Sequence, residues 1–317
     1  MYDMEVYDAV LMLTESKLHI LSVAKDYLVK NLGASRIVIV TKRDCFDKIN
    51  EIVGCDKRFL IMDEDELYPQ LTYSRIAEVL NTICGKTQRA GWFFQQFLKM
   101  AYSFVTNRKY YLVFDADTVP LTPIPYFDEC GKPQFITKKE FCKSYFDTLD
   151  VLFNGEVHRV EQQVSYIAEN MIINTGIMRE IIRRIENDGR LSGDVFFERI
   201  LYAIDKNVVH VTGFSEFETY GNYVMTFYPQ MYNRVSLRTQ RLGTFLLGSQ
   251  PDKEQLDWAS DSYDIISFED HGKSWLKNKT QKNEIRSKYT AKEMFDRYHK
   301  ISNFVDRLLL RPVVEID

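Results

Sequence analysis

The stretch Tyr110-Tyr111-Leu112-Val113-Phe114-Asp115-Ala116-Asp117-Thr118-Val119-Pro120 decides the fold prediction, because an apolar run ends there in two aspartates one residue apart. The run predicts a strand that is buried on both faces, as in a parallel sheet. Ligands of open α/β sheets bind beyond the carboxyl ends of strands, which is where Asp115 and Asp117 would lie. Two carboxylates without a local Lys or Arg suit a hard divalent cation that also contacts a substrate phosphate.

The segments that precede this stretch alternate between strand and helix patterns. Strands are predicted at 9–14, 36–41 and 59–62, and an amphipathic helix at 16–31 with Gly33 just beyond its end. Such alternation favours a parallel sheet with right-handed crossovers.

The segment 91–106 predicts a helix that is apolar nearly all round. Its polar side chains, Gln95, Gln96, Lys99 and Ser103, share one face at spacings of three and four residues. This stripe either points at a specific ligand or faces solvent.

Later segments predict further strands at 172–174, 208–212 and 263–268, the first of them ending at a turn. A helix is expected from a cap at Ser192 to about Ala203, and another from Thr290 onward. We therefore predict an α/β domain over 1–275 and a helical C-terminal tail over 276–317 that packs on it.

Composition excludes several classes of protein. A net charge of −4 with interspersed signs gives no basic surface for nucleic acid. Five cysteines without a Cys-x-x-Cys pattern favour a reducing compartment. The residues after Met1 do not resemble a signal peptide, and no apolar stretch approaches about 18 residues, so we expect a cytoplasmic protein. Membrane contact would be peripheral at most: the leucines of 307–311 either pack within the protein, which the pattern favours, or touch the inner face of a membrane.

Two enzyme classes place an Asp-x-Asp pair after a strand. Phosphatases of the haloacid dehalogenase type would use Asp115 as nucleophile, and Gly193-Asp194 with Glu198 would serve as their downstream acidic motif. Their pair normally follows the first strand of the fold, whereas about three strand patterns precede it here. The other class is the nucleotide-sugar glycosyltransferases of GT-A fold.

The chain resembles the GT-A glycosyltransferases at several points between residues 9 and 275. The segment 113–118 is similar to their metal-binding DxD motif, and Lys99 matches a phosphate-side lysine of the glycogenin-like family. The segment 271–275 (HGKSW) is similar to a late motif of that family, although Ser274 replaces its proline and the spacing is compressed. Segments 91–99 and 215–221 resemble a group of bacterial proteins assigned as glycosyltransferases.

The resemblance implies a GT-A (Rossmann-like), mainly parallel sheet flanked by helices. It also implies transfer of a sugar from a nucleotide diphosphate donor, UDP-linked, to a saccharide or lipid-linked acceptor in surface polysaccharide synthesis. Mn²⁺ or Mg²⁺ would neutralise the leaving diphosphate. Asp117 is the expected direct ligand, and Asp115 would bind the metal through water or hold the donor ribose. His271 would either complete the metal shell or be an ordinary surface histidine, and Lys273 would reach the diphosphate.

Other residues are expected to contact the donor or the acceptor. Thr14 and Glu15 follow the first strand and can contact a base or ribose. Asp44 either contacts the base or caps a helix. Gln95 lies on the same polar stripe as Lys99. Glu216 and Glu218 flank Phe217 and are expected to point the same way. They are the candidates for the general base of an inverting enzyme, and the alternative is a pair of exposed loop carboxylates. Trp92 would stack on a sugar or belong to the core.

Two further functions remain open from the sequence. A sugar-phosphate nucleotidyltransferase uses similar metal chemistry but usually carries a Gly-rich N-terminal loop, which is absent from 9–35. A non-catalytic carbohydrate-binding protein would keep the aromatic residues without needing the Asp pair.

Overall fold

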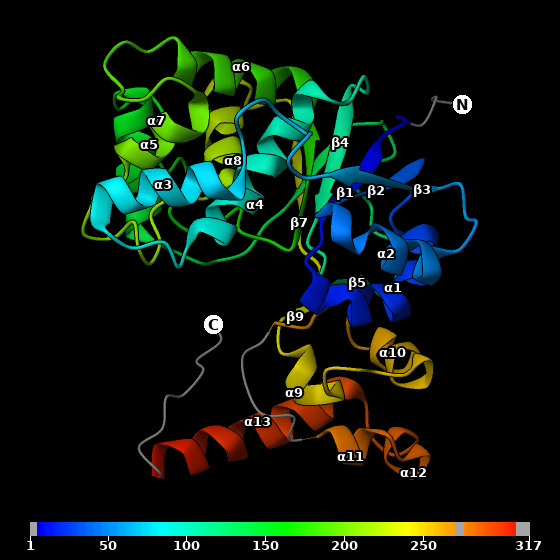
Figure 1. Cartoon of the computed structure of the whole chain (residues 1–317). Coiled ribbons are helices and arrows are strands. Elements are labelled where there is room, and N and C mark those ends of the chain that lie inside the picture. The colour runs from blue at the N-terminus through cyan, green and yellow to red at the C-terminus, as the bar shows by residue number, and fades with distance from the viewer. Residues whose placement is uncertain (1–4, 270–275, 309–317) are drawn as a thin grey trace.

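A five-stranded sheet lies at the centre of the computed structural model, which describes residues 5–269 and 276–308 (Figure 1). The strand order is β3-β2-β1-β4-β7. The strands are β1 Asp8–Met12, β2 Arg36–Thr41, β3 Phe59–Asp63, β4 Tyr110–Phe114 and β7 Asn170–Asn174. β1 to β4 pair in parallel, and β7 runs antiparallel to β4. The prediction of a mainly parallel sheet is therefore confirmed.

The central strands are buried along their whole length, which explains their unbroken apolar sequences. Every residue of β1 and of β4 is buried, and so is every residue of β2 except Arg36. A strand that is covered on both faces has no solvent side on which polar residues would alternate. β3 lies at one edge of the sheet and is more exposed.

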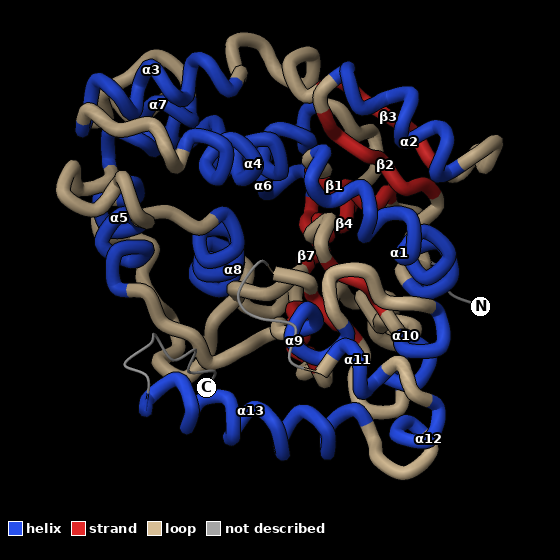
Figure 2. The backbone as a smooth tube through the Cα atoms, turned by 60° about the horizontal axis from the view of Figure 1, so that its bottom comes forward, coloured by secondary structure: helices blue, strands red, loops and turns tan. Residues whose placement is uncertain are grey.

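Helices cover the sheet on two sides. In Figures 1 and 2, α1 Leu18–Asn31 and α2 Phe46–Val53 lie beside β1 to β3. The helices beyond β4 and β7 are α3 Tyr73–Cys84, α4 Ala90–Ala101, α5 Lys143–Phe153, α6 Thr175–Glu186, α7 Phe196–Ala203 and α8 Glu216–Phe227. Short 3₁₀ helices are η1 Glu15–Lys17, η2 Arg43–Cys45 and η3 Tyr102–Phe104.

Two small sheets extend the fold beyond the Asp pair. One joins β5 Thr118–Pro120, β10 Ile265–Ser267 and β9 Thr239–Gln240, and the other joins β6 Gln134–Ile136 and β8 Asn233–Val235. β5 pairs antiparallel with β10, so that Thr118 lies opposite Ser267. The segment directly after the Asp pair is thus fixed to the late strand that the sequence predicted at 263–268.

Five helices form a layer below the sheet (Figures 1 and 2). They are α9 Gly243–Leu247, α10 Lys253–Ser260, α11 Lys277–Thr280, α12 Asn283–Arg286 and α13 Ala291–Leu308. The Trp258 indole donates to the Tyr289 carbonyl (2.9 Å), and the Gln255 amide donates to the Thr280 hydroxyl (2.9 Å). Helices from both sides of the predicted boundary at 275 and 276 therefore pack on one another, and the helix expected from Thr290 is confirmed as α13.

Three predicted segments differ in the structure. Residues 208–212 form consecutive turns, in which the Val208 and Val209 amides donate to the Asp205 carbonyl, and not a strand. The helix expected from Ser192 begins only at Phe196. No turn follows β7, because Asn174 caps α6 directly by accepting a hydrogen bond from the Ile177 amide (3.1 Å).

The five cysteines are all free thiols. Within residues 5–269 and 276–308, the structure contains no helix with the length and apolar character that crossing a bilayer requires.

Candidate functional site

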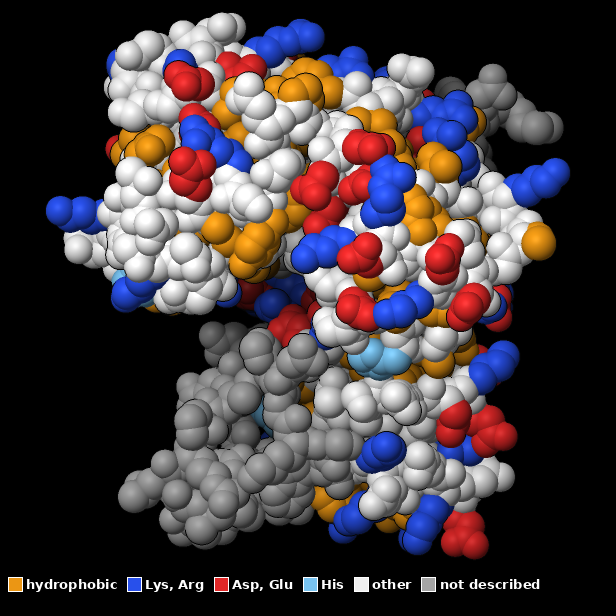
Figure 3. Space-filling view, viewed as in Figure 1, with side chains coloured by type: hydrophobic (Ala, Val, Ile, Leu, Met, Phe, Trp, Pro, Cys, Tyr) orange, Lys and Arg blue, Asp and Glu red, His pale blue; other side chains and the backbone are white. Residues whose placement is uncertain are grey.

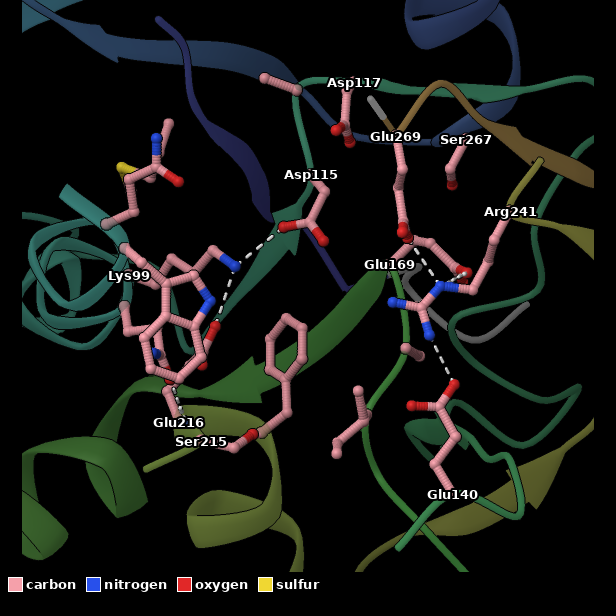
Figure 4. Close-up of a pocket in the computed structure, with 18 of the residues that line it drawn as sticks. Lys99, Asp115, Asp117, Glu140, Glu169, Ser215, Glu216, Arg241, Ser267 and Glu269 are labelled. Atoms are coloured by element: carbon pink, nitrogen blue, oxygen red, sulfur yellow. Dashed lines mark hydrogen bonds and ion pairs between the residues drawn. The ribbon is translucent and has the colours of Figure 1, made fainter. Parts of the chain in front are cut away.

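A cavity of about 610 Å³ opens at the carboxyl end of β4 and contains both aspartates. Its walls come from the turn between β4 and β5, from α4, from the start of α8 and from loops near residues 140, 168 and 241. Figure 3 shows acidic and basic side chains in the hollow between the sheet part and the lower helices, and Figure 4 shows the cavity itself. The cavity therefore joins segments that are far apart in the sequence.

Three backbone hydrogen bonds fix the turn that carries the Asp pair. The Asp115 amide donates to the Glu169 carbonyl (2.9 Å), and the Thr118 amide donates to the Asp115 carbonyl (3.1 Å). The Phe268 amide donates to the Asp117 carbonyl (2.8 Å), which ties the turn to the end of β10. With its backbone groups engaged in this way, the turn holds both carboxylates at the cavity wall.

Asp117 lies in an electrostatic environment that disfavours its charge. Burial raises the pKa of its carboxyl group, and the charges of Asp115 and Glu269 raise it further. The Lys17 ammonium, 3.5 Å from Asp117, acts in the opposite direction without cancelling the effect. Negative charge has therefore accumulated around Asp117, and a bound cation would relieve this repulsion.

Lys99 connects the Asp pair to α8. Its ammonium lies 2.8 Å from the Asp115 carboxylate and 2.8 Å from the Glu216 carboxylate (Figure 4). Burial by itself would lower the pKa of Lys99, but the charges of the two carboxylates outweigh it and raise the pKa. The Lys99 side chain is 11% exposed and stays charged, so its two ion pairs fix the positions of both carboxylates.

Arg241 organises the opposite wall of the cavity (Figure 4). Its guanidinium lies 2.6 Å from Glu269 and 2.6 Å from Glu140, and 3.9 Å from Glu169. Burial would lower the pKa of Arg241, but the charge of Glu269, followed by that of Glu140, raises it overall. Glu169 also pairs with Lys138. This network joins the loop at 140 to the end of β10.

The residues around Asp117 fit a hard divalent cation. Asp115, Asp117 and Glu269 offer only oxygen ligands, which Mg²⁺ and Mn²⁺ prefer. In the part of the chain that the structure describes, no three His, Cys, Asp or Glu side chains are close enough to hold a metal alone. A cation there would complete its shell with water and substrate phosphate, as Mg²⁺ sites usually do. The predicted ligand His271 lies outside the described residues, and so does Lys273.

Most of the site residues predicted from sequence line the cavity. Those that do are Thr14, Gln95, Lys99, Asp115, Asp117 and Glu216. Glu15 and Asp44 are exposed and do not line it, and Glu15 pairs with Lys48 on the surface. Their contacts with a nucleoside stay predictions. Ser103, the last member of the polar stripe, is buried in η3.

Glu218 does not share the environment of Glu216, and the prediction that the two carboxylates point the same way is wrong. Both lie in the first turn of α8, where residues two apart are about 200° apart around the helix axis. Glu218 is fully buried and accepts hydrogen bonds from Ser165 (2.6 Å) and Asn222 (2.9 Å). Burial raises the pKa of Glu218, although these hydrogen bonds oppose it. Glu218 therefore supports the loop at 165, outside the cavity lining.

The acidic motif required by the phosphatase alternative lies elsewhere. Glu198 is buried, accepts a hydrogen bond from Arg75 (2.7 Å) and does not line the cavity. Asp115, the nucleophile of that alternative, is paired with Lys99.

Several cavity residues were not predicted from the sequence. They are Lys17, Arg89, Glu140, Glu169, Arg241 and Glu269. Glu269 directly follows a predicted strand, as Asp115 does, so its position in the site could have been predicted from the sequence. Arg241 and Glu140 lie in irregular segments whose sequences give no such signal. Trp92, for which stacking and core roles were open, is half-buried and lines the cavity.

The sequence matches DUF6492, described as a family of unknown function, over residues 15–225. The chain belongs to this family. The region matched by DUF6492 includes the Asp pair, Lys99 and Glu216, whereas Arg241 and Glu269 lie beyond it. No curated protein matches the chain.

Solved structures that are similar to this DUF6492 chain include the apo form of mouse xyloside xylosyltransferase 1, with 11% identity and a TM-score of 0.43 over 83% of this chain and 98% of that one. The bifunctional glycosyltransferase WbbM has 11% identity and a TM-score of 0.43 over 93% of this chain and 52% of its own. The galactosyltransferase LgtC, in complex with donor and acceptor sugar analogs, has 9% identity and a TM-score of 0.42 over 89% of this chain and 96% of its own.

Proposed function

We propose that this protein is a GT-A glycosyltransferase that transfers a sugar from a nucleotide diphosphate donor, UDP-linked, to a saccharide or lipid-linked acceptor. One observation carries the proposal: the two aspartates that follow β4 both line a cavity of about 610 Å³ at the carboxyl edge of a mainly parallel sheet. This is the edge at which open α/β sheets bind their ligands. The volume lies in the range of pockets that enclose whole small molecules.

Asp115 and Asp117 would hold Mn²⁺ or Mg²⁺, and Glu269 lies within charge range of Asp117 to assist them. When bound, such a cation supplies Lewis-acid stabilisation of the charge that develops on a leaving diphosphate. The raised pKa of Asp117 supports this assignment, because groups with perturbed pKa values cluster at functional sites.

Lys99 and Lys17 orient the acidic groups. Lys99 holds Asp115 on one side and Glu216 on the other, each at 2.8 Å. The Lys17 ammonium donates to the Phe268 carbonyl (3.0 Å) and lies 3.5 Å from Asp117, so it braces the turn against the end of β10. Preorganised charges of this kind lower the reorganisation that the reaction would otherwise require.

Glu216 is the carboxylate best placed to act on the acceptor. It lines the cavity, and only one of its oxygens, Oε1, bonds to Lys99. In an inverting reaction, its other oxygen, Oε2, would accept the proton of the acceptor hydroxyl. The anomeric configuration of the product, read by NMR, distinguishes this role from a retaining reaction, which needs no base at that position.

The cellular setting follows from the resemblance described above. We infer that the protein acts in the cytoplasm, at the inner face of a membrane when the acceptor is lipid-linked, in the synthesis of a surface polysaccharide.

Thermal denaturation with UDP, with and without Mn²⁺, tests the proposal. We expect UDP to raise the melting temperature only when the metal is present, and Asp117→Asn to remove this shift while the protein stays folded. Asp147→Asn is the matched control, because Asp147 is exposed and pairs with Lys143 on the helix surface. A wild-type protein that responds to no nucleotide, with or without metal, would refute the donor assignment.

A further inference from the structure

We propose that the end of the cavity around Arg89 is a subsite for an acidic saccharide, and that the acceptor therefore carries a carboxylate or a phosphate group. This inference rests on the proposed function, because it treats the saccharide as the acceptor of sugar transfer.

Arg89 differs from the other basic residues of the cavity. Lys17, Lys99 and Arg241 all lie within ion-pair distance of carboxylates. The Arg89 guanidinium, in contrast, makes no ion pair or hydrogen bond with the side chains described for 5–269 and 276–300, and its Nε is buried without a partner among them. A partly desolvated cation without a counter-charge is a natural binding partner for an anionic ligand.

The surroundings of Arg89 confirm that its charge is not compensated. Burial lowers the pKa of the Arg89 guanidinium, and only the weak influence of the Tyr145 hydroxyl opposes this. An arginine stays charged in spite of such a shift. A carboxylate or phosphate that enters the cavity would meet a cation that is already partly stripped of water, and the resulting pair would be stronger than one at an open surface.

Aromatic side chains provide the rest of this subsite. The Arg89 guanidinium lies 4.1 Å from the centre of the Trp92 ring, which fixes its plane. Phe141 and Tyr145 also line the cavity, and Phe141 is 59% exposed. Flat apolar side chains of this kind pack against the faces of sugar rings, while a few polar groups set orientation. An arginine that stacks on Trp92, in a cavity that Phe141 and Tyr145 also line, therefore suits a sugar with one anionic substituent.

The position of Arg89 separates this anion from the diphosphate of the donor. Arg89 precedes α4, and Lys99, which bonds to Asp115, lies ten residues further along the same helix. At a rise of about 1.5 Å per residue, the two positions are about 15 Å apart along the helix axis. Arg89 and the Asp pair line the same cavity from positions that are well separated along α4, and we therefore assign the anion bound by Arg89 to the second substrate.

Glu216 and Arg89 line the same cavity. Burial raises the pKa of Tyr145. The charge of Glu216 also raises this pKa and the charge of Arg89 lowers it, so Tyr145 lies within electrostatic range of both residues. Gln96, which is 4% exposed and lines the cavity, uses its Oε1 to accept from the Glu216 amide (3.2 Å) and leaves its Nε2 without a partner. A saccharide anchored at Arg89 would thus extend its hydroxyl groups towards Glu216.

Ligand-observed NMR titrations of the full chain test this proposal. The probes are D-glucuronate, glucose 6-phosphate and neutral glucose, and the two acids distinguish a carboxylate from a phosphate. We expect at least one acid to bind wild-type protein about tenfold to a hundredfold more tightly than glucose, as one charge-assisted pair provides. Raising the salt concentration should weaken binding of that acid and leave binding of glucose unchanged.

Arg89→Gln should abolish the preference for the acid, and Arg89→Lys should retain part of it, because it keeps the charge but loses the flat guanidinium. Arg190→Gln is the control, since Arg190 is an exposed arginine that pairs with Asp188. The subsite is refuted if wild-type protein binds glucose as tightly as both acids, or if the preference survives in Arg89→Gln. Stabilisation of the wild-type protein by UDP with Mn²⁺ is measured separately, so that failure of the donor site and failure of this subsite give different results.

Discussion

Replacing Lys99 by Met should destabilise the protein strongly, because it removes the cation that two carboxylates share. The ammonium lies 2.8 Å from both Asp115 and Glu216. Met fills a similar volume, so that the change removes charge with little change in packing. The variant would keep two neighbouring carboxylates without a counter-charge.

The expected loss follows from the burial of these two groups. Breaking a buried ion pair from one side costs about 3–5 kcal/mol. The Glu216 side chain is 5% exposed and retains the full penalty, whereas that of Asp115 is 34% exposed and is partly screened by solvent. We therefore expect a loss of about 3 kcal/mol at pH 7, at the lower end of that range.

The contribution of Lys99 to folding stability should depend on pH in a definite direction. The pKa of Lys99 is raised in the folded protein, so its contribution is fully present below its unfolded pKa of about 10.4 and is lost only as pH rises through the folded value. Between pH 5 and pH 9 the wild-type contribution should be constant.

Urea denaturation followed by Trp fluorescence measures the effect, since the chain has three Trp residues. Lys143→Met is the matched control, because Lys143 is 77% exposed in its pair with Asp147 and should matter by less than about 1 kcal/mol. The double variant Lys99→Met/Glu216→Gln should recover about 2 kcal/mol, since it removes the buried charge left behind. A loss in Lys99→Met no larger than in Lys143→Met at pH 7 would refute the reasoning.

Two further predictions concern the fold outside the cavity. Gly221→Ala should lower the free energy of unfolding by about 1–3 kcal/mol, because the added Cβ would lie 2.2 Å from the Tyr166 ring. Gly189 has open space around it, so Gly189→Ala should change the free energy of unfolding little in the same urea titration. Burial raises the pKa of Glu64 to about 7, so folding stability should fall as pH rises from about 4.5 to about 7, and Glu64→Gln should flatten this slope. An unchanged free energy of unfolding in Gly221→Ala would contradict the first expectation. The same dependence of stability on pH in wild type and Glu64→Gln would contradict the second.

The strands of the main sheet were predictable because burial on both faces leaves a strong local signal. β2 coincides with the predicted 36–41, and β4 with the apolar run before Asp115. The run at 208–212 carries a similar signal, yet it forms turns. In this segment Val209 is buried but Val211 is 57% exposed, and the local amides bond to the Asp205 and Val208 carbonyls instead of to a neighbouring strand. A short apolar run does not reveal whether a partner strand exists.

The site was predictable to the extent that its residues follow regular elements. Asp115 and Asp117 follow a strand, and Lys99 lies on a helix whose polar stripe was visible. The side chain of Glu218 was predicted to point the wrong way because the sequence did not show whether 215–221 forms a strand or a helix. Residues two apart lie on the same side of a strand but on different sides of a helix. Arg241 could not be assigned, because its role depends on Glu140, which is 101 residues away in the sequence.

The pairing of β5 with β10 affects the order in which this protein is assembled during translation. The Thr118 and Ser267 hydroxyl groups lie 2.8 Å apart, although 149 positions separate them in the chain. Closing so long a loop carries a large entropic cost, and topologies rich in such distant contacts fold slowly. On the ribosome, β1 to β4 emerge long before β10 exists. A nascent polypeptide can therefore have most of its parallel strands in register while the wall beyond Asp117 is still missing, and ligand capture must wait for the emergence of β10.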